Sequence, residues 1–132
     1  MQKRNLLYAA LILATMVALS SCFHHHHDIT VKVNDDEDVY RLRASFDEDL
    51  SGDVQRVINT HLRQHHSATL VHRYTDKEIT LADGTSFYVK TGPGRLRIKI
   101  DKTENPAEGC EEVKEMCEEI KTVLAGKKYY EQ

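Results

Sequence analysis

The chain has 132 residues, of which 18 are basic and 21 acidic, so its formal net charge is −3 with histidine neutral. This acidic balance argues against a nucleic-acid-binding protein, because such proteins usually carry a basic domain. Hydrophobic residues make up 40% of the chain and recur in alternating runs, which indicates a folded rather than a disordered protein. The length suffices for one domain with a single core.

The first 21 residues have the layout of an export signal. Lys3 and Arg4 give a basic start, an uncharged apolar run follows over residues 6–19, and two serines precede Cys22. The apolar run is shorter than the roughly 20 residues that a membrane-spanning helix needs. A cleaved signal is therefore favoured over a transmembrane anchor.

Leu19, Ser20, Ser21 and Cys22 resemble the lipobox of bacterial lipoproteins. The resemblance implies cleavage before Cys22, a diacylglyceryl group on its sulfur, and a further acyl chain such as palmitate on the freed amino group. It also implies a protein tethered to a membrane of the bacterial cell envelope and facing outside the cytoplasm, on the outer membrane if the host has one. An ordinary secretory signal, with Cys22 merely near the cut, is the alternative.

This interpretation divides the chain into a signal peptide (1–21), a lipidated cysteine with a histidine-rich linker (22–28), a small domain (29–126) and a C-terminal tail (127–132). Cleavage removes two basic residues, so residues 22–132 carry 16 basic and 21 acidic residues, a formal net charge of −5. The linker contains four consecutive histidines, a tract that can bind zinc, nickel or copper loosely. These are His24, His25, His26 and His27.

Alternation of apolar and polar residues predicts two strands at 29–33 and 40–46, joined by an acidic turn over 34–38. A helix over 52–65 follows, with Asp49 or Ser51 as its cap. Its apolar face has the spacing of a single helical stripe. The face consists of Val54, Val57, Ile58, His61, Leu62 and His65.

Four further strands are predicted at 69–74, 78–82, 85–90 and 95–101, separated by turn-forming sequences. A final helix is expected to begin with Asn105 as cap and Pro106 in its first position, with Glu108 placed to reach back, and to end at Gly126. The resulting order is ββαββββα. We expect an α+β two-layer sandwich, with a mostly antiparallel sheet carrying both helices on one face.

Histidine is the first candidate for chemistry. His61 and His65 lie one helical turn apart, so they could share a zinc ion, with His72 or a residue of the 24–27 tract as third ligand. The segment 61–65 lacks the glutamate that serves as general base in zinc proteases. The sequence therefore allows metal binding without hydrolysis; the alternative is that His61 and His65 only border the core.

A second candidate is a basic sheet face. Arg95, Arg97 and Lys99 alternate with apolar residues on one predicted strand, and Arg41 and Arg43 do so on another. Beside a membrane, such a face could meet anionic headgroups, acidic glycan or an acidic envelope protein. The alternative is a solvated face balanced by neighbouring acids.

Cys110 and Cys117 would lie about 10.5 Å apart between Cα atoms if both are on the final helix, beyond the roughly 7 Å limit for a disulfide. We therefore predict two buried free thiols, with a bend at Gly109 or pairing between chains as alternatives. The glutamates around both cysteines disfavour a reactive thiolate.

Motifs of catalysis are absent from the sequence: it has neither a phosphate-binding loop nor a nucleophile elbow. Residues 47–53 resemble half of a calcium-binding EF-hand loop, but Ile58 stands where the bidentate glutamate is needed. Our leading hypothesis is a non-enzymatic, lipid-anchored envelope protein that binds a partner or surface and needs no cofactor beyond its covalent lipid. The alternative is a zinc-type metal-binding lipoprotein using His61, His65, His72 and the 24–27 tract.

Overall fold

The computed structural model describes residues 28–130, with side chains described up to residue 126. The predictions that concern the signal, Cys22 and the histidine tract lie outside the described residues. The elements, in chain order, are β1 (Thr30–Asp35), β2 (Val39–Ser45), the short 3₁₀ helix η2 (Glu48–Leu50), α2 (Ser51–Gln64), β3 (Asp76–Thr80), β4 (Ser86–Gly92), β5 (Arg95–Asp101) and α3 (Ala107–Tyr130).

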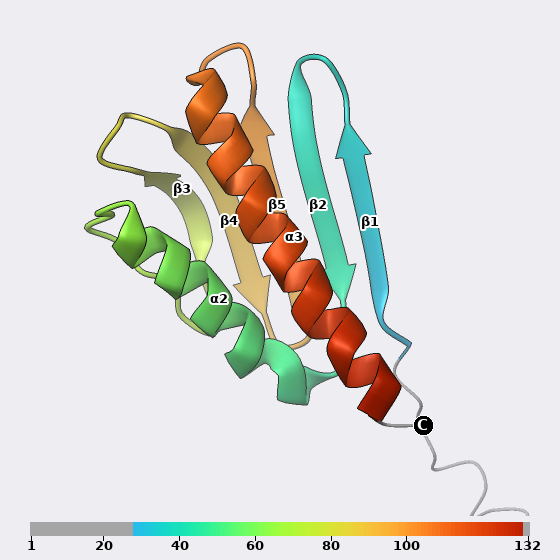
Figure 1. Cartoon of the computed structure of the whole chain (residues 1–132). Helices are drawn as coiled ribbons and strands as arrows, with labels where there is room; N and C mark the ends of the chain where they lie inside the picture. The colour runs from blue at the N-terminus through green and yellow to red at the C-terminus, as the bar shows by residue number, and fades with distance from the viewer. Residues whose placement is uncertain (1–27, 131–132) are drawn as a thin grey trace, which may run out of the picture.

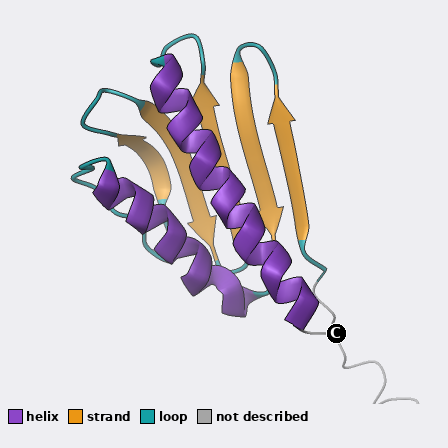
Figure 2. Ribbon diagram, in the orientation of Figure 1, coloured by secondary structure: helices purple, strands orange, loops and turns teal. Residues whose placement is uncertain are grey.

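The five strands form one sheet in the order β1-β2-β5-β4-β3, and every neighbouring pair is antiparallel. Both helices lie on the same face of this sheet, with α3 crossing its centre and α2 beside it (Figures 1 and 2). The predicted α+β two-layer sandwich is confirmed. No described element covers the opposite face of the sheet, which is left open.

The core fills the space between the two layers. Apolar residues of β2, β4 and β5 point inward at alternate positions and meet the buried faces of α2 and α3. Among the described residues, the fully enclosed apolar side chains lie between Tyr40 and Leu124 and form one cluster. We therefore expect residues 28–132 to fold without the signal and the linker.

The prediction of a strand at 69–74 is wrong, and the side chain of Asn59 explains why this segment does not join the sheet. Its side-chain oxygen accepts a hydrogen bond from the Val71 N–H at 2.8 Å, and its amide donates to the Val71 carbonyl at 3.1 Å. Gln55 also donates to that carbonyl, at 3.2 Å. Val71 is fully buried, but its backbone pairs with side chains of α2 rather than with another strand. The observed order is therefore ββαβββα.

The predicted start and end of the last helix also differ from the structure. The Asn105 oxygen accepts from the Ser86 N–H, and its amide donates to the Asp101 carbonyl, both at 2.7 Å. Asn105 thus connects β4 to the end of β5 instead of capping α3. The helix continues through Gly126 to Tyr130, because Gly126 does not adopt the positive φ of a helix-ending glycine.

The predicted cap of the first helix is also absent. Asp47 accepts from the Asp49 N–H at 3.0 Å and so starts the 3₁₀ turn before α2. The Ser51 hydroxyl accepts instead from the Gly94 N–H at 2.9 Å, joining the start of α2 to the β4–β5 turn. The acidic segment 47–53 is therefore used for local turns and helix entry.

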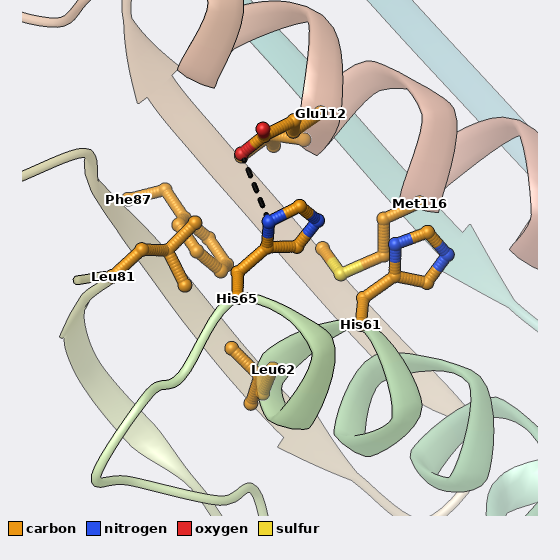
Figure 3. Close-up of a pocket in the computed structure, with 8 residues that line it drawn as sticks. His61, Leu62, His65, Leu81, Phe87, Glu112 and Met116 are labelled. Atoms are coloured by element: carbon orange, nitrogen blue, oxygen red, sulfur yellow. Dashed lines mark ion pairs between the residues drawn. The ribbon is translucent and has the colours of Figure 1, made fainter. Parts of the chain in front are cut away.

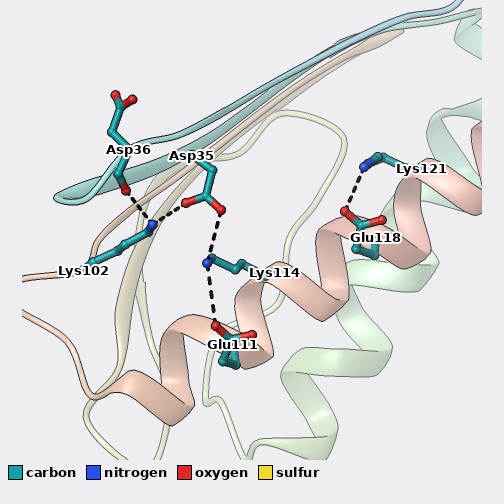
Figure 4. A network of polar contacts seen from close by, with 7 residues as sticks. All are labelled: Asp35, Asp36, Lys102, Glu111, Lys114, Glu118 and Lys121. Carbon is teal, nitrogen blue, oxygen red and sulfur yellow. Dashed lines mark hydrogen bonds and ion pairs between the residues drawn. The ribbon is translucent and has the colours of Figure 1, made fainter.

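An ion-pair network joins α3 to the β1–β2 hairpin (Figure 4). Lys102 pairs with Asp35 and donates to the Asp36 carbonyl at 2.5 Å. Lys114 of α3 lies 3.3 Å from Asp35 and 3.6 Å from Glu111. The hydrogen bond from Lys102, with a further contribution from Lys114, lowers the pKa of the Asp35 carboxyl.

Candidate functional site

The open face of the sheet carries the basic residues that the sequence predicted there. Strand alternation sends Arg41 and Arg43 of β2, and Arg95, Arg97 and Lys99 of β5, to the face opposite the helices, and all five are exposed. Their apolar neighbours in the two strands point into the core. β2 and β5 are adjacent in the sheet, so the two sets form one patch.

The register of the strands extends this patch on both sides. Lys32 of β1 lies opposite Arg43, which lies opposite Arg97, which in turn lies opposite Lys90 of β4. A single row of four basic residues therefore crosses four strands. All these basic side chains are exposed, and we call the set the basic face: Lys32, Arg41, Arg43, Lys90, Arg95, Arg97 and Lys99.

Acidic residues of the open face lie at its margins. Asp76 lies opposite Lys90 and forms an ion pair with it at 3.8 Å, while the Tyr88 hydroxyl donates to Asp76 at 2.5 Å. Glu78 lies opposite Tyr88. The hydrogen bond to the Asp76 carboxylate raises the pKa of Tyr88.

A third acid, Asp101, follows Lys99 on the same face at the end of β5. Hydrogen bonds from Thr103, with a smaller contribution from Lys99, lower the pKa of the Asp101 carboxyl. These acids balance charge at the margins of the face only.

The centre of the basic face has no such balance. Among residues 28–126, no carboxylate forms an ion pair with Arg41, Arg43, Arg95, Arg97 or Lys99. The alternative that neighbouring acids neutralise the face is thus not supported at its centre. The projecting side chains enclose a hollow of about 370 Å³, lined by Arg41, Leu42, Arg43, Tyr88, Arg97, Ile98 and Lys99.

Helix α3 has the opposite net charge. Over Ala107–Tyr130 it contains six glutamates and four lysines, and all the glutamates except Glu112 are exposed. The glutamates of α3 and the basic residues of β2 and β5 therefore belong to opposite faces of the sheet.

The two helices are joined by histidine–carboxylate pairs. His61 Nε2 lies 2.6 Å from Glu119 Oε2, and His65 Nδ1 lies 3.3 Å from Glu112 Oε2. The imidazole rings stack with centroids 6.5 Å apart. Figure 3 shows both rings beside Met116, with His65 directed toward Glu112. These residues line a cavity of about 10 Å³. That volume is about the minimum needed to hold one water molecule.

The predicted zinc ligands are only partly brought together. His72 lies beside Ser51 and Arg95 at the start of α2, in a different hollow from that of His61 and His65 near the end of that helix. The described residues contain no group of three histidine, cysteine or acidic side chains that could hold a metal ion. Participation of the 24–27 tract stays a prediction.

The two cysteines of α3 are buried free thiols. Burial raises the pKa of Cys110, and burial also raises the pKa of Cys117 to about 12. Both thiols are therefore protonated at neutral pH, and neither has the environment of a nucleophile. The bent helix and the intrachain disulfide that we considered from the sequence are not found.

Sequence reasoning missed the carboxylate partners of His61 and His65. Glu112 and Glu119 are seven residues apart, a spacing that places them on one side of a helix. The sequence shows this spacing, but it does not show which face of α3 contacts α2. Sequence reasoning also missed Lys32 and Lys90, which join the basic face only through strand pairing.

No family model, curated protein or solved structure matches this chain. Within residues 28–130, no helix has an apolar stretch of the length needed to cross a membrane.

Proposed function

We propose that the protein is a lipid-anchored, non-enzymatic component of the bacterial cell envelope whose domain binds an anionic surface through its basic face. The observation that carries the proposal is the open side of the sheet, where five exposed basic residues of β2 and β5 form no ion pair with a carboxylate of the described residues. A purely solvated face would be expected to mix both signs, as the β3 edge does.

The predicted anchor would hold the domain close to a membrane. Five residues separate Cys22 from Asp28, so the two are six residue steps apart, and such a segment spans at most about 20 Å when extended. Exposed charges are screened beyond about 8 Å at physiological ionic strength. A short tether therefore keeps the basic face within reach of a charged surface that it would otherwise meet rarely.

A binding role fits the environment of the reactive side chains better than catalysis does. The thiols are buried and protonated, and the histidines near the end of α2 pair with glutamates of α3 rather than with a serine or cysteine. Two hollows with basic linings lie on the basic face, where broad contact with a surface is possible.

Two measurements test the proposal. Metabolic labelling with an alkyne fatty acid should mark the wild-type protein and leave the Cys22→Ala protein unlabelled and unprocessed, since the thiol receives the lipid. Residues 28–132 should cosediment with anionic vesicles at low salt and dissociate as salt rises. Equal labelling of both proteins would refute the anchor, and absence of vesicle binding at low salt would refute the role of the basic face.

A further inference from the structure

Four of the basic residues form a compact square at the centre of the open sheet. Arg41 lies directly opposite Lys99, and Arg43 lies directly opposite Arg97, on the adjacent antiparallel strands β2 and β5. Residues that face each other across such a pair have Cβ atoms about 4.5–5.5 Å apart. We call these four residues the basic square.

This arrangement is unfavourable for the domain alone. Like charges directly opposite each other on neighbouring strands destabilise a sheet. The same sheet avoids the problem at its other end, where Asp76 faces Lys90 and Glu78 faces Tyr88. Local rules of this kind tend to be broken at functional sites, where a ligand supplies what the chain lacks.

The shape of the square suits a small anionic group. The hollow of about 370 Å³ is bordered by its four basic side chains and by Tyr88, over the backbone of Leu42 and Ile98. Three of the four are arginines, whose planar guanidinium groups bind phosphate oxygens in pairs. The apolar side chains of Leu42 and Ile98 point into the core, so the hollow presents charge and hydrogen-bond donors to its occupant.

We infer that the basic square, Arg41, Arg43, Arg97 and Lys99, binds the phosphate group of an anionic phospholipid headgroup. This inference rests on the proposed function and adds a defined ligand and a defined orientation to it. The strands lie parallel to the membrane, with α2 and α3 on the far side. The glutamates of α3 then lie as far from the anionic surface as the fold allows, which favours this orientation over the reverse.

Two pairs of substitutions distinguish a phosphate site from general attraction. Arg43→Gln with Arg97→Gln removes two charges from the square, and Lys32→Gln with Arg95→Gln removes two charges from the same face outside it. Affinity of residues 28–132 is measured on phosphatidylcholine vesicles that contain phosphatidylglycerol, and binding of inorganic phosphate is measured separately.

The outer pair should weaken binding to the phosphatidylglycerol vesicles about 30-fold, since each basic residue near a charged surface contributes about 1 kcal/mol. The square pair should weaken this binding at least about tenfold more, because the paired guanidinium contacts to phosphate oxygens are also lost. The melting temperature of the Arg43→Gln, Arg97→Gln variant should equal or exceed that of the wild type, since cross-strand repulsion is relieved.

Each contrary result has a distinct meaning. Equal losses for the two pairs would refute the phosphate site and leave a generally basic face, so the proposed function would survive. Failure of the wild type to bind any anionic vesicle would refute both the phosphate site and the proposed function of the basic face. Saturable binding of inorganic phosphate that the square pair removes, without a greater loss of vesicle binding from that pair, would identify a free phosphate compound as the ligand. Self-association without vesicles would identify a second copy of the chain as the occupant.

Discussion

The side chain of Thr85 occupies the place that a Cβ atom on Gly109 would need. A Cβ built on Gly109 would lie 1.8 Å from Thr85 Oγ1 and 2.8 Å from the other two Thr85 side-chain atoms nearest to it. Both residues are buried, so neither can move freely into solvent. The close approach holds the first turn of α3 against the β3–β4 turn.

Gly109→Ala should therefore lower the free energy of unfolding by about 1–3 kcal/mol, the usual cost of overpacking. Gly126 provides the control, since it lies in the same helix with nothing within 4 Å of its Cβ position. Gly126→Ala should stabilise by up to about 1 kcal/mol through helix propensity. Urea titrations of the two variants measure the difference, and a stabilised Gly109→Ala would contradict the packing.

Asn59→Ala should destabilise the domain by about 2 kcal/mol, because it removes two hydrogen bonds and leaves the buried Val71 N–H without a partner. Gln55→Ala removes one bond to the same carbonyl at a half-buried position and should cost less. Thermal unfolding compares the two variants. A larger effect from Gln55→Ala would mean that Asn59 does not fix the 65–75 segment.

Asp35→Asn should reduce the loss of unfolding free energy that occurs as the pH falls, the acid limb of the stability curve. The folded-state pKa of Asp35 is lowered, so its stabilising effect is present above the unfolded value near 4 and is lost as the pH falls through the folded value. The wild type should lose more stability than the variant below about pH 4. Asp36→Asn is the matched control, since Lys102 contacts only the Asp36 backbone carbonyl. Parallel acid-limb slopes for Asp35→Asn and the wild type would exclude this linkage.

Native alkylation should be slow at both cysteines and slower at Cys117 than at Cys110. Cys117 is fully enclosed and its pKa is raised to about 12, while Cys110 retains 6% exposure. Denaturation should make both thiols react at similar rates. Mass spectrometry after timed alkylation without reductant gives the result, and detection of a bond between the two sulfurs would contradict the continuous α3 helix.

Zinc binding separates the two functional hypotheses. Because the described residues contain no three-ligand group around His61 and His65, we expect residues 28–132 to bind zinc no more tightly than their His61→Ala, His65→Ala variant. Residues 22–132 should bind more zinc through His24–His27. Calorimetry at pH 7 makes the comparison. Tight binding by residues 28–132 that the double substitution removes would instead support the metal-binding alternative.

The sequence predicted what depends on local periodicity. The alternation in 95–101 located β5 at its observed bounds, and the helical stripe located α2 within one residue at each end. The alternation in 69–74 failed as a predictor because burial of Val71 does not reveal whether its backbone pairs with a strand or with the Asn59 side chain. An extended segment looks the same in both cases.

The sequence predicted only part of the basic face, because local periodicity does not show which strands are neighbours. Arg41 and Arg95 could be assigned to a face from their own strands, but the position of β5 beside β2 could not, because these strands are separated by 49 residues of chain that include α2. The position of Arg43 opposite Arg97 depends on the order of the strands in the sheet. The His61–Glu119 pair depends in the same way on how α2 packs against α3.

The basic face and the glutamates of α3, on opposite sides of the sheet, give the molecule an electric dipole moment perpendicular to the sheet. The isoelectric point of about 6.2 for the whole sequence describes only the sum of its charges and not their placement. A cation-exchange resin would therefore retain the domain at pH values where its net charge is negative. Many copies tethered to one membrane would share a common orientation, and their parallel dipoles would repel one another sideways and keep the copies apart.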